Sequence, residues 1–228
     1  VMRTTFSARE FTGESLPNTV LYEILDHARF APSGGNRQGG RVIIVRNEAT
    51  KDEMARLAEP ASKRYAAQVA AGESPWNAVI PSGVSDETIE QTPVPALLTE
   101  PLRRADVLLI FVVDLRVVAA TDQSLGRVGI VGGASIYPLV WNTLLAARRA
   151  GFGGTLTTIS VASEPQVKTL LDIPSSFAIA AVLPLGRPVK QLTRLRRLPV
   201  EDFTFTERFG GECLSSNESI RCKPEENE

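Results

Sequence analysis

Short runs of consecutive apolar residues, each bounded by polar ones, recur along the chain. The clearest are residues 41–46 (RVIIVR), 106–114 (DVLLIFVVD) and 177–185 (FAIAAVLPL). They are short for helices, and the first is rich in β-branched residues, which favours a strand. The other two are apolar at nearly every position, so we expect strands that are covered on both faces.

Segments with apolar residues at helical spacing are interspersed with these runs. The first helix is expected to follow Ser15 as N-cap, with Pro17 in its first turn. Its apolar face comprises Val20, Leu21, Ile24, Leu25 and Ala28. A capping-box pattern at Thr50 and Glu53 predicts a second helix that runs to about residue 71, with an interruption at Pro60.

Two more helices are predicted in the second half of the chain. Residues 131–150 form the most apolar helical segment, and Pro138 either kinks it or lies in its first turn. The glycine-rich residues 151–154 then lead to a short strand. Ser163 and Gln166 form another capping-box pattern, which predicts a helix through residue 171.

Two segments lack periodicity. Residues 72–104, a lid or insertion, contain several prolines, and so long a loop is typical of a lid, a binding segment or a disordered segment. Trp76 in this loop would cover a ligand or act as a packed anchor. Residues 210–228 are polar, and we expect a tail that is disordered or a weakly held arm. The interspersed strands and helices of residues 1–209 predict a single α+β domain with a mixed central sheet flanked by helices.

Composition excludes several classes of protein. The 228 residues carry a net charge of −1, which argues against a nucleic-acid-binding protein. No apolar run is long enough to span a membrane, and no secretory leader is evident. With one histidine, and with Cys213 and Cys222 confined to the tail, we expect no metal site. A reducing cytoplasm is the expected location.

The densest polar chemistry lies in residues 31–38 (APSGGNRQ). Pro32 ends the preceding helix, and Gly34 permits a close approach to another group. Ser33, Asn36 and Gln38 add hydrogen-bonding groups. A polar turn would explain this cluster, but arginines near both ends of the chain could hold an anion. Signature motifs of serine hydrolases, zinc proteases, P-loop proteins and Rossmann dinucleotide sites are absent.

Four motifs, in this order, resemble those of the nitroreductase family of flavin-dependent oxidoreductases. They are TFSAREF at residues 5–11, APSGGNRQ at 31–38, WNTLLAARRAG at 141–151 and LRRLPV at 195–200. Each motif by itself is weak evidence for the family. Together, the four occur in the family's order and the resemblance covers the chain to about Phe209. The resemblance implies an α+β fold, an intertwined homodimer, and FMN bound at the interface between the two chains.

The same resemblance implies roles for individual residues. The FMN phosphate or ribityl chain would meet Ser7 and Arg9, with Arg3 as a substitute for the family's first arginine. The predicted FMN-binding residues are Arg3, Ser7, Arg9, Pro32, Ser33, Gly34, Asn36, Gln38, Leu156, Thr157, Thr158, Arg187, Arg196 and Arg197. Among these, Arg197 would bind the phosphate through its guanidinium fork. Thr157 and Thr158 would lie near the flavin N5, unless they are strand residues without a flavin contact.

Two positions depart from the family pattern. Thr5 replaces the first arginine, and Gly39–Gly40 replace a proline and a bulky residue, which would widen the space near the flavin or loosen the loop. The implied activity is ping-pong transfer of electrons from NADH or NADPH, through FMN, to a small acceptor such as a nitroaromatic or a quinone. The alternatives are reductive dehalogenation, oxidative flavin breakdown, storage of FMN without turnover, or a protein whose arginines are surface charge.

Overall fold

A computed structural model describes residues 1–215 and divides the chain into two compact units. The main unit comprises residues 1–192 and holds every described α-helix and strand. The second unit begins at Thr193, and its described part contains a 3₁₀ turn at Val200–Asp202 and a contact between the rings of Phe205 and Phe209. The predicted single domain, which ended at residue 209, stays a prediction. Residues 216–228 of the predicted tail, with Cys222, lie outside the described residues.

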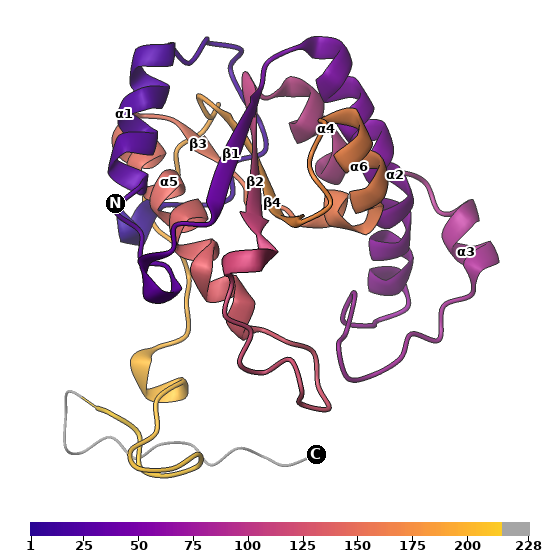
Figure 1. The fold of residues 1–228 in the computed structure, drawn as a ribbon. Coiled ribbons are helices and arrows are strands. Elements are labelled where there is room, and N and C mark those ends of the chain that lie inside the picture. The colour runs from indigo at the N-terminus through magenta and orange to yellow at the C-terminus, as the bar shows by residue number, and fades with distance from the viewer. Residues whose placement is uncertain (216–228) are drawn as a thin grey trace. The chain divides into compact units, whose positions relative to one another are not determined.

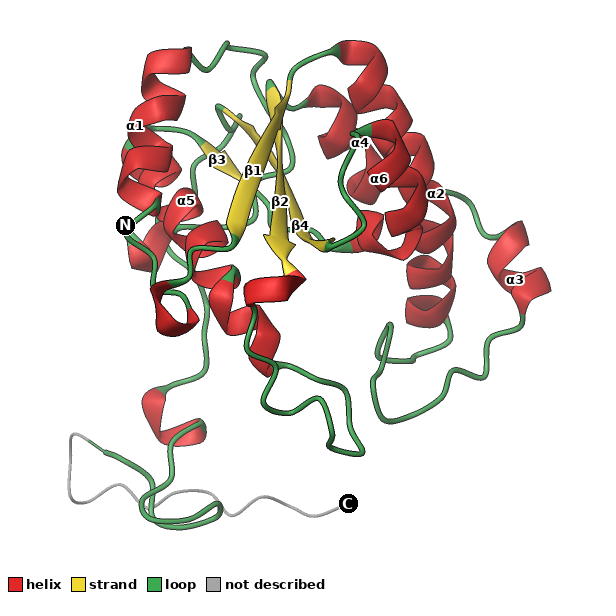
Figure 2. Cartoon of the chain, viewed as in Figure 1, coloured by secondary structure: helices red, strands yellow, loops and turns green. Residues whose placement is uncertain are grey.

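The main unit is built on a four-stranded sheet in the order β1-β2-β4-β3. Its strands are β1 (Gly40–Val45), β2 (Val107–Asp114), β3 (Gly153–Gly154) and β4 (Phe177–Gly186), shown in Figure 2. Neighbouring strands pair antiparallel, while an isolated bridge between Ser7 and Gly154 is parallel. The three predicted apolar runs are therefore strands, each within a residue or so of its expected bounds.

Helices cover both faces of the sheet (Figure 1). One face packs against α1 (Asn18–Ala28) and α5 (Tyr137–Arg149). The other packs against α2 (Glu48–Ala70), α4 (Ala96–Arg104) and α6 (Glu164–Leu170), while the short α3 (Asp86–Gln91) lies outside this layer.

The central strand β2 shows why the chain forms two cores. Alternate residues of a strand point to opposite faces of the sheet. Leu109 and Phe111 belong to the core shared with α1 and α5, whereas Leu108 and Ile110 belong to the core shared with α2 and α4. All four side chains are buried, so the uninterrupted apolar run serves both layers. The predicted α+β fold with a helix-flanked sheet is confirmed.

Several predicted helix starts are wrong in detail. The N-cap of α2 is Asn47, whose Oδ1 accepts a hydrogen bond from Thr50 N at 3.0 Å, so the helix begins before the capping-box pattern. Pro60 does not interrupt α2, which continues to Ala70. Ser163 is the N-cap residue of α6, as predicted, but the capping hydrogen bond does not form, because its hydroxyl donates to the Leu57 carbonyl at 2.8 Å.

The ends of two other predicted segments also differ from expectation. Pro17, rather than Ser15, is the N-cap residue of α1. Residues 131–135 form a 3₁₀ turn, and α5 begins at Tyr137, so Pro138 lies in its first turn, where its missing N–H costs no hydrogen bond. The predicted lid of residues 72–104 contains α3 and α4.

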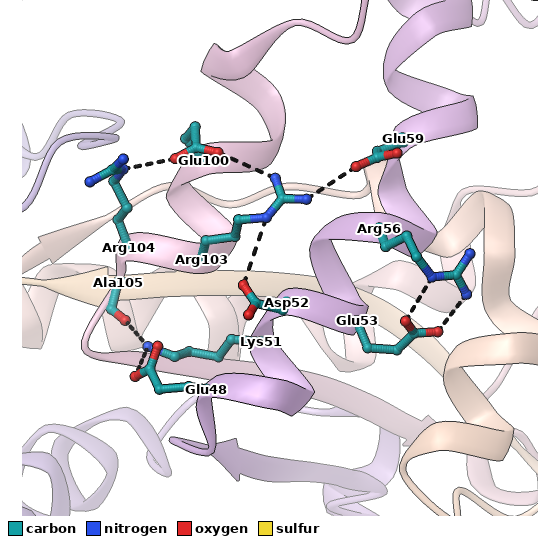
Figure 3. Close-up of polar contacts among 10 residues, drawn as sticks. All are labelled: Glu48, Lys51, Asp52, Glu53, Arg56, Glu59, Glu100, Arg103, Arg104 and Ala105. Atoms are coloured by element: carbon teal, nitrogen blue, oxygen red, sulfur yellow. Dashed lines mark hydrogen bonds and ion pairs between the residues drawn. The ribbon is translucent and has the colours of Figure 1, made fainter.

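An ion-pair network joins α4 to α2 (Figure 3). The Arg103 guanidinium lies 3.1 Å from a Glu59 oxygen, 3.3 Å from Glu100 and 3.7 Å from Asp52. Below it, Lys51 is buried and donates a hydrogen bond to the Ala105 carbonyl at 2.8 Å. The last part of the predicted lid is therefore joined to α2 by ion pairs, and its role as a lid stays a prediction.

No helix within residues 1–215 combines the length and the apolarity that a membrane span requires.

Candidate functional site

A cavity of about 570 Å³ opens in the main unit. Six segments line it: the N-terminal segment, α2, the loop after α2, α4, the chain that follows β3, and β4 through Pro184. The lining residues include Arg9, Tyr65, Trp76, Leu97, Leu98, Pro101, Thr155, Leu156, Thr157, Thr158 and Ile159. Its volume lies within the range of about 300–1,000 Å³ typical of ligand sites.

The glycines before this segment explain how Arg9 and Thr157 reach the same cavity. Ala8 N donates a hydrogen bond to the Gly154 carbonyl at 3.0 Å, which fixes the N-terminal segment beside β3. A Cβ atom at Gly154 would collide with the Pro184 carbonyl oxygen, so this close approach requires glycine. Thr157 then exchanges two backbone hydrogen bonds with Val182, at 2.9 and 3.0 Å.

Arg9 gives the cavity a positive charge that is free to bind a ligand. Its side chain is half-buried, and no hydrogen bond or ion pair joins it to another residue of the described chain. Ser7, two residues earlier, is exposed. A guanidinium without a protein partner, next to hydroxyl groups, suits a phosphate group. The donors present therefore fit the anionic end of FMN.

The threonine segment supplies hydroxyl groups and irregular backbone at the same cavity. Thr158 and Leu156 are exposed, and the Thr157 hydroxyl accepts a hydrogen bond from Ile159 N at 3.3 Å. Thr157 forms an isolated bridge to β4 and also lines the cavity, so pairing with a strand does not keep it away from the cavity. Contact with a flavin stays a prediction.

The polar cluster of residues 31–38 lies elsewhere: none of these residues lines the cavity. The loop is held by hydrogen bonds from Gly34 N to the Ser135 hydroxyl at 3.2 Å and from Gln38 N to the Ser33 hydroxyl at 3.0 Å. Pro32, Asn36 and Gln38 are exposed.

Backbone strain marks this loop as more than a simple turn. Asn36 has a φ of 52° and Gln38 a φ of 49°, in the left-handed region that L-residues seldom adopt. Each such residue costs about 1 kcal/mol or more, and such strain clusters at functional sites. Within one chain, the structure therefore separates two groups of predicted site residues: the Arg9 cavity and the strained loop.

The remaining predicted site residues have different surroundings. Arg3 is exposed near the N-terminus. Arg187 stacks on the Phe152 ring at 4.8 Å and pairs with Glu14 at 2.5 Å, so its charge already has a partner. Arg196 and Arg197 belong to the second unit, where the Arg197 guanidinium donates to the Arg196 carbonyl. Their roles in FMN binding stay predictions.

Both departures from the family pattern have structural explanations. Thr5 is buried and its hydroxyl donates to the Val1 carbonyl at 3.1 Å, so it faces the protein interior. A Cβ atom at Gly39 would lie 2.5 Å from a Val117 methyl, and one at Gly40 would lie 2.9 Å from Ile136. The glycines allow close packing there, which differs from the expected widening or loosening of the loop.

Sequence reasoning missed the apolar wall of the cavity. Tyr65 comes from α2, and Leu97, Leu98 and Pro101 come from α4. The prolines of residues 93–101 concealed α4, and the contacts that form the wall join distant segments. The Thr50 helix pattern did contain Tyr65, but nothing in the sequence indicates which face of that helix meets α4.

Comparisons with known proteins identify the family. The model of the nitroreductase family matches residues 2–187. A protein of Thermus thermophilus named NADH dehydrogenase is 29% identical over 86% of this chain and 88% of its own length. A Bacillus subtilis protein named FMN reductase [NAD(P)H] is 25% identical over 89% of this chain and 70% of its own.

A solved structure has the same fold: that of an iodotyrosine deiodinase bound to FMN and 3-iodo-L-tyrosine. Its TM-score is 0.63 at 22% identity, over 87% of this chain and 94% of the other.

The chain belongs to the nitroreductase family, since the family model spans most of it. The predicted family is confirmed, as are the enzyme class, an NAD(P)H-dependent flavin oxidoreductase, and the cofactor, FMN. The match ends at Arg187, so the basic motif at residues 195–200 lies beyond it.

Proposed function

We propose that this protein passes electrons from NADH or NADPH to a small electron-poor acceptor, such as a nitroaromatic or a quinone, by a ping-pong mechanism. The observation that carries the proposal is the Arg9 guanidinium, which has no partner in the described chain and lies in a cavity whose other walls are hydroxyl-bearing, aromatic and aliphatic. Such a cavity can hold an anionic group at one end and a planar ring at the other.

The chain's own residues would bind and orient the cofactor. Arg9 and Ser7 would hold the FMN phosphate, and Thr157 and Thr158 would lie beside the ring. When bound, FMN supplies the redox chemistry, since it can accept a hydride from a reduced nicotinamide and then reduce a second molecule. Tyr65 and Trp76 would stack on planar substrates and exclude water.

The proposal includes a homodimer. The strained loop of residues 31–38 would reach the cofactor from a second copy, because in its own chain it does not line the cavity. Two aromatic residues of α5 support this view: Tyr137 is 41% exposed and Trp141 is 43% exposed. A cytoplasmic location completes the proposal, in keeping with the need for reduced nicotinamide.

Other activities of the same cavity have different observable consequences. Storage of FMN would give a yellow protein that NADH and NADPH fail to bleach. Reductive dehalogenation would release halide from a haloaromatic, and flavin breakdown would destroy the cofactor. A protein whose arginines are surface charge would be colourless.

Absorbance of the purified protein tests the proposal. We expect a flavin spectrum that is bleached by NADH or NADPH without oxygen and restored by a nitroarene or a quinone. Acceptor should be consumed in proportion to the nicotinamide oxidised. A flavin-loaded protein that no reduced nicotinamide bleaches would contradict the proposed reaction and leave storage as the function.

A further inference from the structure

Trp76 lies between the Arg9 cavity, here taken as the site where the acceptor also binds, and a second cavity of about 630 Å³. The second cavity is lined by the end of α2 and the loop that follows it, including Arg64, Gln68, Glu73, Asn77, Ser82 and Asp86. In the described chain, Trp76 is the one residue that lines both cavities. Trp76 therefore forms part of the wall of each cavity, while 46% of its surface stays exposed.

Two residues of α2, one helical turn apart, hold Trp76. The Arg64 guanidinium carbon lies 4.5 Å from the centre of the Trp76 ring, which is cation–π geometry. Gln68 is 2% exposed, and its side-chain oxygen accepts a hydrogen bond from Trp76 N at 3.2 Å. Trp76 has a φ of 55°, a conformation that requires support from its surroundings.

The loop around Trp76 is closed mainly by hydrogen bonds of Glu73, a carboxylate that Arg64 also attracts electrostatically. Glu73 N donates to the Gln68 carbonyl at 2.9 Å, and the Glu73 carboxylate accepts hydrogen bonds from the Ser82 hydroxyl at 2.6 Å and from Gly83 N at 2.7 Å. The bond from Ser82 is the largest cause that lowers the pKa of Glu73, so this carboxylate stays charged. Gln68 and Glu73 thus fix the backbone, and Arg64 contacts the ring.

Apart from an electrostatic attraction to Glu73, which contributes to the lowered pKa of that carboxylate, Arg64 has no polar partner in the described chain. Its Nε–H is buried without an acceptor, and no hydrogen bond or ion pair joins it to another described residue. A buried donor without a partner costs free energy. The contact that the placement gains is the stack on Trp76.

We propose that Arg64 is a positioning residue that determines acceptor size, an inference that rests on the proposed function. It holds the Trp76 ring as a fixed partition, so the enzyme favours small planar acceptors over polycyclic ones. Without the cation, the ring can turn into the second cavity, which enlarges the acceptor cavity.

Acceptor selectivity tests the proposal. Arg64→Met removes the charge and keeps much of the apolar stem, Arg64→Lys keeps a charge, and Arg56→Met removes a cation whose ion pair lies within α2. We expect Arg64→Met to lower the ratio of kcat/KM for a one-ring over a polycyclic nitroarene by about two- to fivefold, the equivalent of one partly exposed cation–π contact. Arg64→Lys should give a selectivity ratio between those of Arg64→Met and the wild type, and Arg56→Met should have the wild-type ratio.

Flavin content and the rate of reduction by NADH should match the wild type in all three variants. An unchanged selectivity ratio in Arg64→Met would overturn the proposal. So would loss of flavin, or equal slowing of both half-reactions, because Arg64 would then be a purely structural residue.

Tryptophan emission separates this proposal from the proposed function. The chain has two tryptophans, so Trp141→Phe leaves Trp76 as the only emitter. In that background, Arg64→Met should increase quenching by acrylamide, whether or not the protein turns over an acceptor. If the wild type shows no nicotinamide-dependent turnover but the quenching increases, the reaction is wrong and the positioning role stands. Unchanged quenching would overturn the positioning role.

Discussion

Arg9 is the residue on which the candidate site depends most. Its guanidinium has no protein partner in the described chain, so a bound phosphate would gain a charge-assisted contact without displacing another. Removing such a contact costs about 1.5–3 kcal/mol. We expect Arg9→Met to weaken FMN binding by about ten- to a hundredfold.

Fluorescence titration of the apoprotein with FMN measures this loss. Arg29→Met is the matched control, because Arg29 is exposed and pairs with Asp26 on the surface of α1. Equal affinity in Arg9→Met and the wild type would remove Arg9 from the phosphate site.

At Gly154 the packing of β3 against β4 leaves no room for a side chain. A Cβ atom there would overlap the Pro184 carbonyl oxygen, which belongs to the rigid strand β4. We expect Gly154→Ala to lower the free energy of unfolding by about 1–3 kcal/mol. Gly126→Ala is the control, since nothing lies within 4 Å of its added Cβ. Urea unfolding measures the stability of both variants. Equal stability would show that β3 can shift to make room for the added methyl group.

At the scale of elements, the Arg103 network decides whether α4 is a wall or a lid. Arg103 is 29% exposed and pairs with carboxylates of both α2 and α4, whereas Arg104 is 75% exposed and pairs with Glu100 in its own helix. We expect Arg103→Met to cost about 1 kcal/mol and Arg104→Met less than about 0.5 kcal/mol in urea unfolding. Equal costs would mean that apolar packing alone holds α4.

One carboxylate, that of Asp122, holds the conformation of the loop of residues 118–130. Asp122 Oδ2 accepts hydrogen bonds from Ile130 N at 2.7 Å and from Arg127 at 2.8 Å. The bond from Ile130 is the largest cause that lowers the pKa of Asp122, to about 2. Because the folded pKa lies below the ordinary value, this stabilisation is present above about pH 4 and is lost as the pH falls towards 2.

The Asp122→Asn variant tests this dependence. The difference in unfolding free energy between it and the wild type should be largest above pH 4 and shrink towards pH 2. Urea unfolding at several pH values provides the measurement. A difference that does not vary with pH would indicate that the charge of Asp122 is unimportant.

The sequence predicts an element well where one pattern, such as a run of apolar residues, determines the structure. It predicts less well where two patterns, such as alternative caps or a proline within a helix, favour different structures. The strands were found because consecutive apolar residues suit a sheet covered on both faces. The start of α2 was misplaced because Thr50 and Glu53 resemble a capping box, while Asn47 supplies the cap. The helix α4 was hidden by Pro101, which the structure accommodates within it.

The candidate site shows the same division. Arg9, Thr157 and Trp76 were predicted and share a cavity, because motif residues carry recognisable chemistry. Tyr65 and the residues of α4 were missed, because packing between distant segments leaves no local pattern. The Arg64 stack on Trp76 was likewise invisible, since it requires the loop conformation at Trp76.

At the scale of the whole molecule, the separation of the predicted site residues into two groups requires an explanation. The Arg9 cavity and the strained loop of residues 31–38 do not share a cavity in one chain. A second copy would bring the loop of one chain to the cavity of the other. We therefore expect light scattering to give about twice the chain mass of 24.7 kDa at micromolar concentration.

Mixed dimers would test whether the two chains share the site. Arg9→Met and Asn36→Ala should each lower FMN occupancy in homodimers, by removing the phosphate contact and the amide of the loop. In a dimer with one chain of each kind, one site carries both changes and the other carries neither, so we expect about half of the wild-type FMN. Two differently tagged chains, co-expressed and purified through both tags, allow this measurement. If each chain built its own site, every site in the mixed dimer would carry one change and occupancy would stay low. A monomer in light scattering would refute the shared site directly.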